Sequence, residues 1–193
     1  MAGKQAKVLS EPQQKTVLAY LAATRHPIRD KVIFLLSAKT GLRAKKIAAL
    51  TWSGVLDAEG NLADTVTITD RESKGRSGRT VPMNRQLLIA LTELRETCVP
   101  EASSYVVTTE RGARTSANAL VHKFRDWYAR VGLEGASSHS GRRTFITNAA
   151  RKISTVGGSI KDVQQMAGHQ SLGMTQRYID QHIDAQRRVV DLV

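Results

Sequence analysis

Six side chains of the types that perform phosphoryl transfer occur in four short segments of this 193-residue chain. Guanidinium groups bind the non-bridging oxygens of a phosphate and stabilise the charge of a pentavalent transition state. A tyrosine hydroxyl can attack phosphorus to form a covalent intermediate, and a lysine can protonate the departing oxygen. Two arginines, two histidines, a lysine and a tyrosine therefore predict phosphodiester transfer through a protein nucleophile. These residues are Arg43, Lys74, His139, Arg142, His169 and Tyr178.

Each of the four segments has an ordinary explanation when it is taken alone. Arg43 follows a glycine that can end a helix, and Lys74 lies in a glycine-containing turn, where charged residues are common. His139 and Arg142 are one helical turn apart, but a histidine at a helix start is often only a cap. Tyr178, after a short predicted helix, has the properties of a core tyrosine. The combination and order favour chemistry, and because the sequence has no acidic cluster to hold a metal, we expect neither metal nor cofactor.

The charge of the chain favours a polyanion as its partner. Lysine and arginine total 29 against 17 aspartate and glutamate, which gives a formal net charge of +12. Each basic side chain placed against a phosphate releases condensed counterions, so such a surplus suits nucleic acid. A basic protein kept soluble by self-repulsion, or a ribosome-associated fragment, would have the same composition.

Cysteine count and hydropathy exclude several other classes. The single cysteine, Cys98, excludes an intrachain disulfide and a cysteine cluster for zinc. No apolar run approaches the roughly 18 residues of a membrane helix, and residues 1–10 lack the apolar stretch of a signal peptide. We therefore expect a soluble, cytoplasmic protein with no membrane partner.

Helix-capping residues predict three helices in the region that positions Arg43. Ser10 caps the first helix, which has a proline in its first turn, and Pro27 begins the second. Gly41 has the position of a glycine that ends a helix, and the next helix begins at Arg43. Residues 1–9, which precede the first cap, are expected to form a flexible N-terminus.

Alternating residues after this helical region predict a small antiparallel sheet. Residues 65–69 (TVTIT) alternate as a strand does, and residues 79–83 (RTVPM) are the expected return strand. The connection, residues 72–78 (ESKGRSG), contains two glycines and carries Lys74 at a solvent-facing hairpin tip.

The rest of the chain predicts helices and one short strand. Asn84 caps a helix, residues 105–109 form a short strand, and Ser116 caps another helix. Three helices linked at glycines occupy residues 139–179. We therefore expect a mainly α (α+β) fold with a small antiparallel sheet, in which residues 10–193 form a single domain.

Four sequence segments, taken in order along the chain, resemble the catalytic domain of the tyrosine recombinases, the phage integrase family. TGLRAKKIAAL resembles the first arginine motif of that family, and ESKGRSGRTVPM resembles its lysine hairpin. HSGRRTFIT resembles the H-x-x-R motif, and GGSIKDVQQMAGHQSLGMTQRYID resembles the segment from the second histidine to the nucleophile. The resemblance extends from about Lys31 to Asp180 and includes the internal spacings of all four motifs.

The resemblance implies a role for each of the six residues. It assigns two phosphate-binding arginines, a lysine general acid, a histidine that accepts or orients a proton, a histidine that donates a hydrogen bond to the phosphate, and a tyrosine nucleophile. In that order they are Arg43 and Arg142, Lys74, His139, His169 and Tyr178. Further DNA contacts are expected from Lys46, Arg76, Arg79 and Arg143.

The activity implied by the resemblance is site-specific recombination of double-stranded DNA, as in the integration, excision or inversion of a phage or other mobile element. A 3′-phosphotyrosyl link and a free 5′-hydroxyl would form, and that hydroxyl would attack the matching link on a partner duplex without ATP. The implied fold is the mainly helical catalytic domain shared with type IB topoisomerases. Free chains are expected to be monomers that assemble as a homo-tetramer on two duplexes, with accessory DNA-bending proteins as further candidate partners.

Two residues depart from the family pattern. Lys46 occupies a position that is usually acidic and that helps to order the first arginine, and Arg143 occupies a position that is commonly histidine. Lys46 has the same charge as Arg43. This favours an alternative function, a catalytically weak or inactive DNA-binding regulator on the same scaffold. The complete set of six residues favours the enzyme.

The two ends of the chain carry further expectations. The residues before Lys31 are too few for the core-binding and arm-binding domains of longer integrases, so we expect residues 10–193 to be a single integrase-type catalytic domain. Residues 180–193 end in an apolar stretch that is costly to expose. We expect this tail to pack on a neighbouring copy, with folding back onto its own domain as the alternative.

Overall fold

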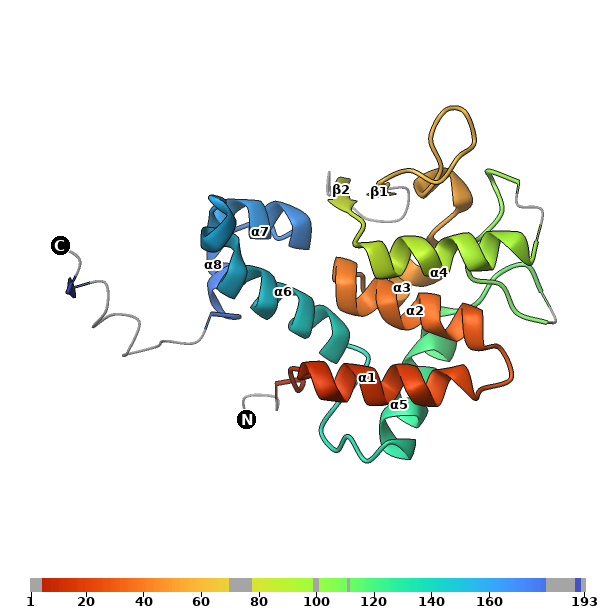
Figure 1. The fold of residues 1–193 in the computed structure, drawn as a ribbon, viewed down its shortest axis with the longest axis horizontal. Helices are drawn as coiled ribbons and strands as arrows, with labels where there is room; N and C mark the ends of the chain where they lie inside the picture. Colours follow the sequence, from red (N-terminus) through yellow and green to blue (C-terminus); the bar gives the residue numbers. More distant parts are fainter. Residues whose placement is uncertain (1–4, 70–77, 99–100, 111, 180–189, 192–193) are drawn as a thin grey trace.

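The computed structural model describes residues 5–69, 78–98, 101–110, 112–179 and 190–191. Its helices pack together with a two-stranded antiparallel sheet at one edge, which confirms the expected mainly α fold (Figure 1). The hairpin tip that carries Lys74 and Arg76, and most of the tail, lie outside the described residues. No helix in the described part of the chain is long and apolar enough to cross a membrane.

The predicted helix starts around Arg43 are confirmed. Helix α1 (Glu11–Ala22) begins with a capping box, in which the Ser10 hydroxyl accepts a hydrogen bond from the Gln13 amide at 3.4 Å. Helix α2 (Pro27–Thr40) begins at its proline, and α3 (Ala44–Ala49) has Arg43 at its N-cap. Gly41 separates the two with φ of +67°, a left-handed conformation that disfavours any residue with a Cβ.

The sheet has the two predicted strands. Strand β1 (Thr65–Ile68) pairs with β2 (Arg79–Pro82), with Val66 opposite Val81. Both valines are buried, while alternate residues of the strands face outward. This pairing places the start of the hairpin connection at the end of β1 and Arg79 at the first position of β2.

Side-chain caps also place α4 (Arg85–Glu96) and α5 (Ala117–Arg130), through Asn84 and Ser116 respectively.

The predicted strand over residues 105–109 is wrong. Its two end residues form only isolated bridges, Tyr105 with Thr51 and Thr109 with Gly112. The physical reason is that Val106 and Val107 are both buried, so the segment passes through the core as a loop and does not alternate between two faces.

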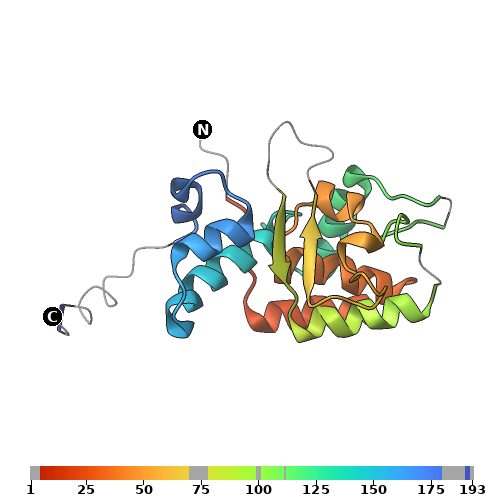
Figure 2. The same cartoon turned by 90° about the horizontal axis from the view of Figure 1, so that it is seen from above.

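The C-terminal part of the described chain has the three predicted helices and one additional short element. They are α6 (Ser140–Lys152), α7 (Ile160–Ala167) and α8 (Leu172–Gln176), with a 3₁₀ turn at Ile153–Val156 between the first two. Helix α6 packs against α2, whereas α7 and α8 lie at one end of the molecule (Figure 2).

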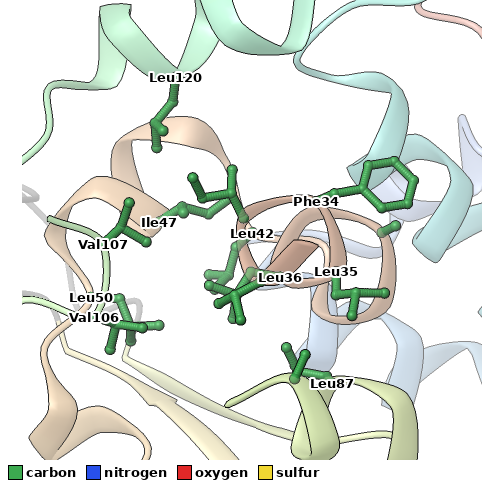
Figure 3. Packing of buried hydrophobic residues seen from close by; sticks show 14 of the residues in the cluster. Phe34, Leu35, Leu36, Leu42, Ile47, Leu50, Leu87, Val106, Val107 and Leu120 are labelled. Carbon is green, nitrogen blue, oxygen red and sulfur yellow. The ribbon is translucent and has the colours of Figure 1, made fainter. Parts of the chain in front are cut away.

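Two hydrophobic clusters hold these elements. The larger one surrounds α2, where Phe34, Leu35 and Leu36 are all fully buried (Figure 3). The smaller one is centred on Ile146, Val163 and Ala167, beneath α7, and adds partly buried neighbours. The partly buried Phe145 and Met166 pack against both clusters and connect them.

The expectation of a flexible terminus over residues 1–9 is wrong at Leu9. This side chain is 1% exposed in the larger cluster, and its amide donates a hydrogen bond to Thr144 Oγ1 of α6 at 2.8 Å. Burial of one leucine contributes roughly 1.5–3 kcal/mol, which is enough to hold the backbone just before the first cap. Residues 1–4 lie outside the described residues.

Candidate active site

Arg142 lies in the first turn of α6 and is only 3% exposed. Its Nη1 donates a hydrogen bond to the Gly41 carbonyl at 2.7 Å, and its Nη2 donates to the Ala167 carbonyl at 3.0 Å. The first carbonyl follows α2, and the second belongs to the last residue of α7. One guanidinium therefore joins two helix ends from distant parts of the chain.

His169 completes the surroundings of that guanidinium. It follows Gly168, whose left-handed backbone (φ +62°) ends α7 and turns the chain back towards α6. The His169 Nε2 lies 2.8 Å from Arg142 Nη2, and its Nδ1 lies 2.9 Å from Thr175 Oγ1 in α8. Burial and the nearby charge of Arg142 lower the pKa of His169 to about 4, so the ring is neutral at physiological pH.

Tyr178 lies two residues after the end of α8, beside these two side chains. Its ring stacks on the His169 ring with centroids 5.5 Å apart and an interplanar angle of 25°. The Arg143 guanidinium lies 5.9 Å from the centre of the Tyr178 ring. Two backbone contacts fix the position, because the Tyr178 amide donates to the Thr175 carbonyl at 2.9 Å and its carbonyl accepts from Thr147 Oγ1 at 3.3 Å.

Arg142 and Tyr178 line a pocket of about 360 Å³, whereas His169 lines a separate pocket together with Arg79. Arg43 and His139 reach the first pocket from the N-caps of α3 and α6, and both are exposed. His139 makes no side-chain capping hydrogen bond, so the structure does not support the simple explanation of a capping histidine. The first pocket is lined by Gln5, Ala6, Arg43, His139, Arg142, Arg143, Arg177 and Tyr178.

The electrostatics of the site suit an anion. Burial, and then the charge of Arg43, lower the pKa of Arg79 to about 10, and burial with the charges of Arg43 and Arg79 lowers that of Arg142 to about 10. Among the described residues, no carboxylate contributes to either shift. Three guanidinium groups with no acidic partner among the described residues favour the arrival of a phosphate. No group of three potential metal ligands occurs in the described part of the chain.

The structure thus brings five of the six predicted catalytic residues to one place, together with Arg79 and Arg143. Lys74 and Arg76 lie outside the described residues, so their positions stay predictions. Lys46 is not part of this pocket: its Nζ donates a hydrogen bond to the Thr69 carbonyl at 3.3 Å, just after β1, and it lines a separate groove. The positive charge of Lys46 is therefore directed to the strand.

Several groups of the site could not be found from the motifs. Thr175 contacts His169, the carbonyls of Gly41 and Ala167 hold Arg142, and Gln5 lines the pocket. Backbone carbonyls carry no sequence signal. Thr175 has a weak one, because it lies three residues before Tyr178, which is the spacing of one helical turn.

Solved structures of other proteins share the fold. The crystal structure of XerA recombinase aligns with a TM-score of 0.73 and 24% identity, over 96% of this chain and 64% of that one. The Tn1549 transposon integrase in complex with a circular intermediate DNA aligns with a TM-score of 0.75 and 18% identity, over 100% and 67%. XerH site-specific recombinase bound to difH substrate aligns with a TM-score of 0.73 and 18% identity, over 98% and 55%.

Sequence comparisons give the same relationship. Tyrosine recombinase XerC of Proteus mirabilis is 26% identical over 163 residues, which are 82% of this chain and 49% of that protein. Tyrosine recombinase XerA of Thermococcus onnurineus is 29% identical over 175 residues, 89% and 57% respectively. The chain thus spans about half the length of these relatives. The model of the phage integrase family matches residues 7–184, and this chain belongs to that family.

Proposed function

We propose that this chain is the catalytic domain of a site-specific DNA recombinase that cleaves DNA through Tyr178. The observation that carries the proposal is that Arg142 and Tyr178, from two separate elements, line one cationic pocket, while His169, from a third element, contacts both side chains. Family membership supports it, as does the similarity to tyrosine recombinases XerC and XerA.

In the proposed cleavage step the Tyr178 phenolic oxygen attacks phosphorus, and the bond from phosphorus to the 5′-oxygen breaks. His139, exposed in the same pocket, accepts or orients the phenolic proton, and Lys74 supplies the proton that the 5′-oxygen takes up. Arg43 and Arg142 stabilise the charge that develops on the non-bridging oxygens. The products are a 3′-phosphotyrosyl link and a 5′-hydroxyl.

Rejoining reverses these roles with a 5′-hydroxyl from a partner strand, so the energy of the broken bond is kept in the covalent link. The substrate class is double-stranded DNA. Exchange between two duplexes requires four active sites, so we propose that monomers assemble as a homo-tetramer on DNA, with DNA-bending proteins as candidate accessory partners. Complexes of structural neighbours with DNA support this substrate class.

The test is capture of the covalent intermediate on a pool of end-labelled, nicked duplexes with randomised flanking sequence. Loss of the short strand beyond the nick removes the hydroxyl needed for rejoining, so cleaved DNA stays attached to the protein after denaturation. We expect labelled adduct with the unaltered chain and none with Tyr178→Phe. Tyr20→Phe, in α1, is the matched control and keeps the adduct. Adduct in Tyr178→Phe, or its mapping to another tyrosine, contradicts the assignment.

The same assay separates the enzyme from a DNA-binding regulator. A regulator shifts the labelled duplexes in a native gel but leaves no protein attached after denaturation. Binding without adduct in the unaltered chain would therefore replace the proposed recombinase by the regulator.

A further inference from the structure

Helices α2 and α6 come very close together at Gly141, the residue before Arg142. A Cβ built on Gly141 would lie 2.9 Å from Ser37 Cβ and 3.1 Å from the Ser37 backbone carbon, and closer still to Ser37 Oγ. Rotation of the Ser37 hydroxyl would relieve only the last of these contacts. Since both residues are buried within their helices, a side chain at Gly141 would have to shift α6 relative to α2.

A second close contact follows one helical turn further along both segments. Gly41 is four residues after Ser37, and Phe145 is four residues after Gly141. A Cβ built on Gly41 would lie 2.6 Å from Phe145 Cδ1, so the phenyl ring packs directly on the Gly41 backbone. The two contacts together determine how far apart α2 and α6 lie.

Arg142 depends on that separation. Its Nη1 donates to the Gly41 carbonyl at 2.7 Å, and the Gly41 amide donates to the Ser37 carbonyl at 3.1 Å. The circuit is closed, because Gly141 packs on Ser37 and precedes Arg142 directly. Nη2 of the same guanidinium donates to the Ala167 carbonyl, so bonds to two helix ends fix its plane. A change in the separation of α2 and α6 must therefore displace the guanidinium or break its bond to Gly41.

The side chain of Ser37 is suited to this contact by its small size. It is 0% exposed, and its Oγ has no hydrogen-bond partner among the described residues. A smaller residue at this position would remove bulk opposite Gly141 without breaking a hydrogen bond to the described part of the chain. Ser37 is therefore the place at which a side chain added to Gly141 can be compensated.

We propose that Gly141 is a positioning residue, whose lack of a side chain sets the separation of α2 and α6 at which the Arg142 guanidinium meets the Gly41 carbonyl. Gly141 is buried and acts on the reaction only through Arg142. The effect on cleavage rests on the proposed recombinase function, whereas the position of the guanidinium does not.

The first measurement is the set of Arg142 side-chain N–H resonances in the free, ¹⁵N-labelled chain, identified by their loss in Arg142→Lys. Hydrogen bonds to two carbonyls should slow rotation of the guanidinium and give resolved Nη–H signals in the unaltered chain. Gly141→Ala should remove or shift these signals. The matched control is Gly173→Ala in α8, a helical glycine whose added Cβ would be 4.0 Å from its nearest packing neighbour, and it should leave them unchanged.

The second measurement is the rate of adduct formation at saturating DNA. Gly141→Ala should lower it about 10- to 100-fold, since a displacement of about 1 Å at a catalytic group costs that much, while the DNA concentration at half-saturation stays within about twofold. Addition of Ser37→Gly removes the opposing Cβ and should recover most of the rate and the resolved Arg142 signals. Addition of Ser37→Ala, which keeps that Cβ, should recover little. Ser37→Gly alone controls for a glycine within α2 and should keep most of the rate.

A milder variant, Ser37→Cys, enlarges the atom that faces Gly141 and should give a smaller fall in rate. If circular dichroism shows that Gly141→Ala does not fold, Ser37→Cys decides by the same two readouts. Unchanged Arg142 signals or an unchanged rate overturns the proposal, as does a loss in Gly141→Ala that Ser37→Gly does not reverse. If the unaltered chain forms no adduct, the proposed function fails, and the Arg142 signals still decide the role of Gly141.

Discussion

Helices α2 and α7 both end beside Arg142, but they are held very differently. Nine of the 14 residues of α2 are buried, so its position is determined by apolar packing on nearly all sides. Helix α7 buries only Val163 and Ala167 among its eight residues. Its position must therefore depend more on polar contacts, and the hydrogen bond from Arg142 to the Ala167 carbonyl is one of them.

This difference divides the candidate site into a frame and a dependent part. Gly41, at the end of α2, belongs to the frame, whereas His169 and Thr175 follow the weakly buried α7. Regions with few buried apolar contacts open at lower free energy than the core of the same molecule. The proposed nucleophile is thus on the part of the fold that is easiest to adjust, and Arg142 connects it to the part that is hardest to move.

The largest expected effect is a loss of stability in the frame. Leu36→Ala removes a fully buried side chain of α2 and should lower the free energy of unfolding by about 2–5 kcal/mol. Urea denaturation followed by circular dichroism measures this change. Ile89→Val, on the exposed side of α4, should remain within about 0.5 kcal/mol of the unaltered chain. A loss below 1 kcal/mol for Leu36→Ala would show that α2 is not the frame.

The connection between the two parts is tested by Arg142→Lys. An ammonium cannot donate to Gly41, Ala167 and His169 in one plane, so the adduct-forming rate at saturating DNA should fall about 10²-fold or more. Arg125→Lys, exposed on α5, is the control for a change of cation type. A fall of less than tenfold in single-turnover cleavage would contradict the role of the guanidinium plane.

A smaller effect is expected from the dependent part. Ile146→Val trims the cluster beneath α7 and should cost about 0.5–1.5 kcal/mol. Hydrogen exchange should then accelerate at α7 amides and stay unchanged at α2. Equal acceleration in both helices would mean that the two clusters open as one unit.

The same contrast explains what the sequence could predict. Caps and periodicity located α1, α2, α4 and α5, because local side-chain hydrogen bonds and one-sided burial determine where such helices begin and which face is buried. The strand predicted over residues 105–109 was wrong because two consecutive valines are buried in the core there, and their burial depends on tertiary packing. The expectation of a flexible terminus was wrong at Leu9 because the burial of this side chain also depends on tertiary packing.

The site was predictable where its chemistry is in side chains of distinctive type. Arg142 and His169 were found because their types and spacing are rare in combination. The hydrogen bond between them could not be predicted, because it depends on where the end of α7 lies relative to α6. Thr175 was missed because a buried threonine in a short helix is ordinary until its hydroxyl is seen 2.9 Å from an imidazole nitrogen.

The last expected effect is a pH dependence that belongs to the dependent part alone. The pKa of His169 falls from 6.5 in the unfolded chain to about 4 in the folded one, because burial and then Arg142, Arg43 and Arg79 disfavour the imidazolium. Between those two values the unfolded chain binds more protons, so acidification from pH 6.5 to pH 4 should lower the free energy of unfolding.

The contribution of His169 is fully present above its unfolded pKa and decreases as the pH falls towards its folded pKa. Urea titrations across this range should show a steeper loss of stability in the unaltered chain than in His169→Gln, which has no group that titrates there. The comparison uses the slope with pH, because the substitution also removes hydrogen bonds at every pH. Hydrogen exchange should locate the acid-induced opening in α7 and α8 before α2. Parallel slopes in the two chains would show that burial and the arginine neighbours do not hold His169 neutral.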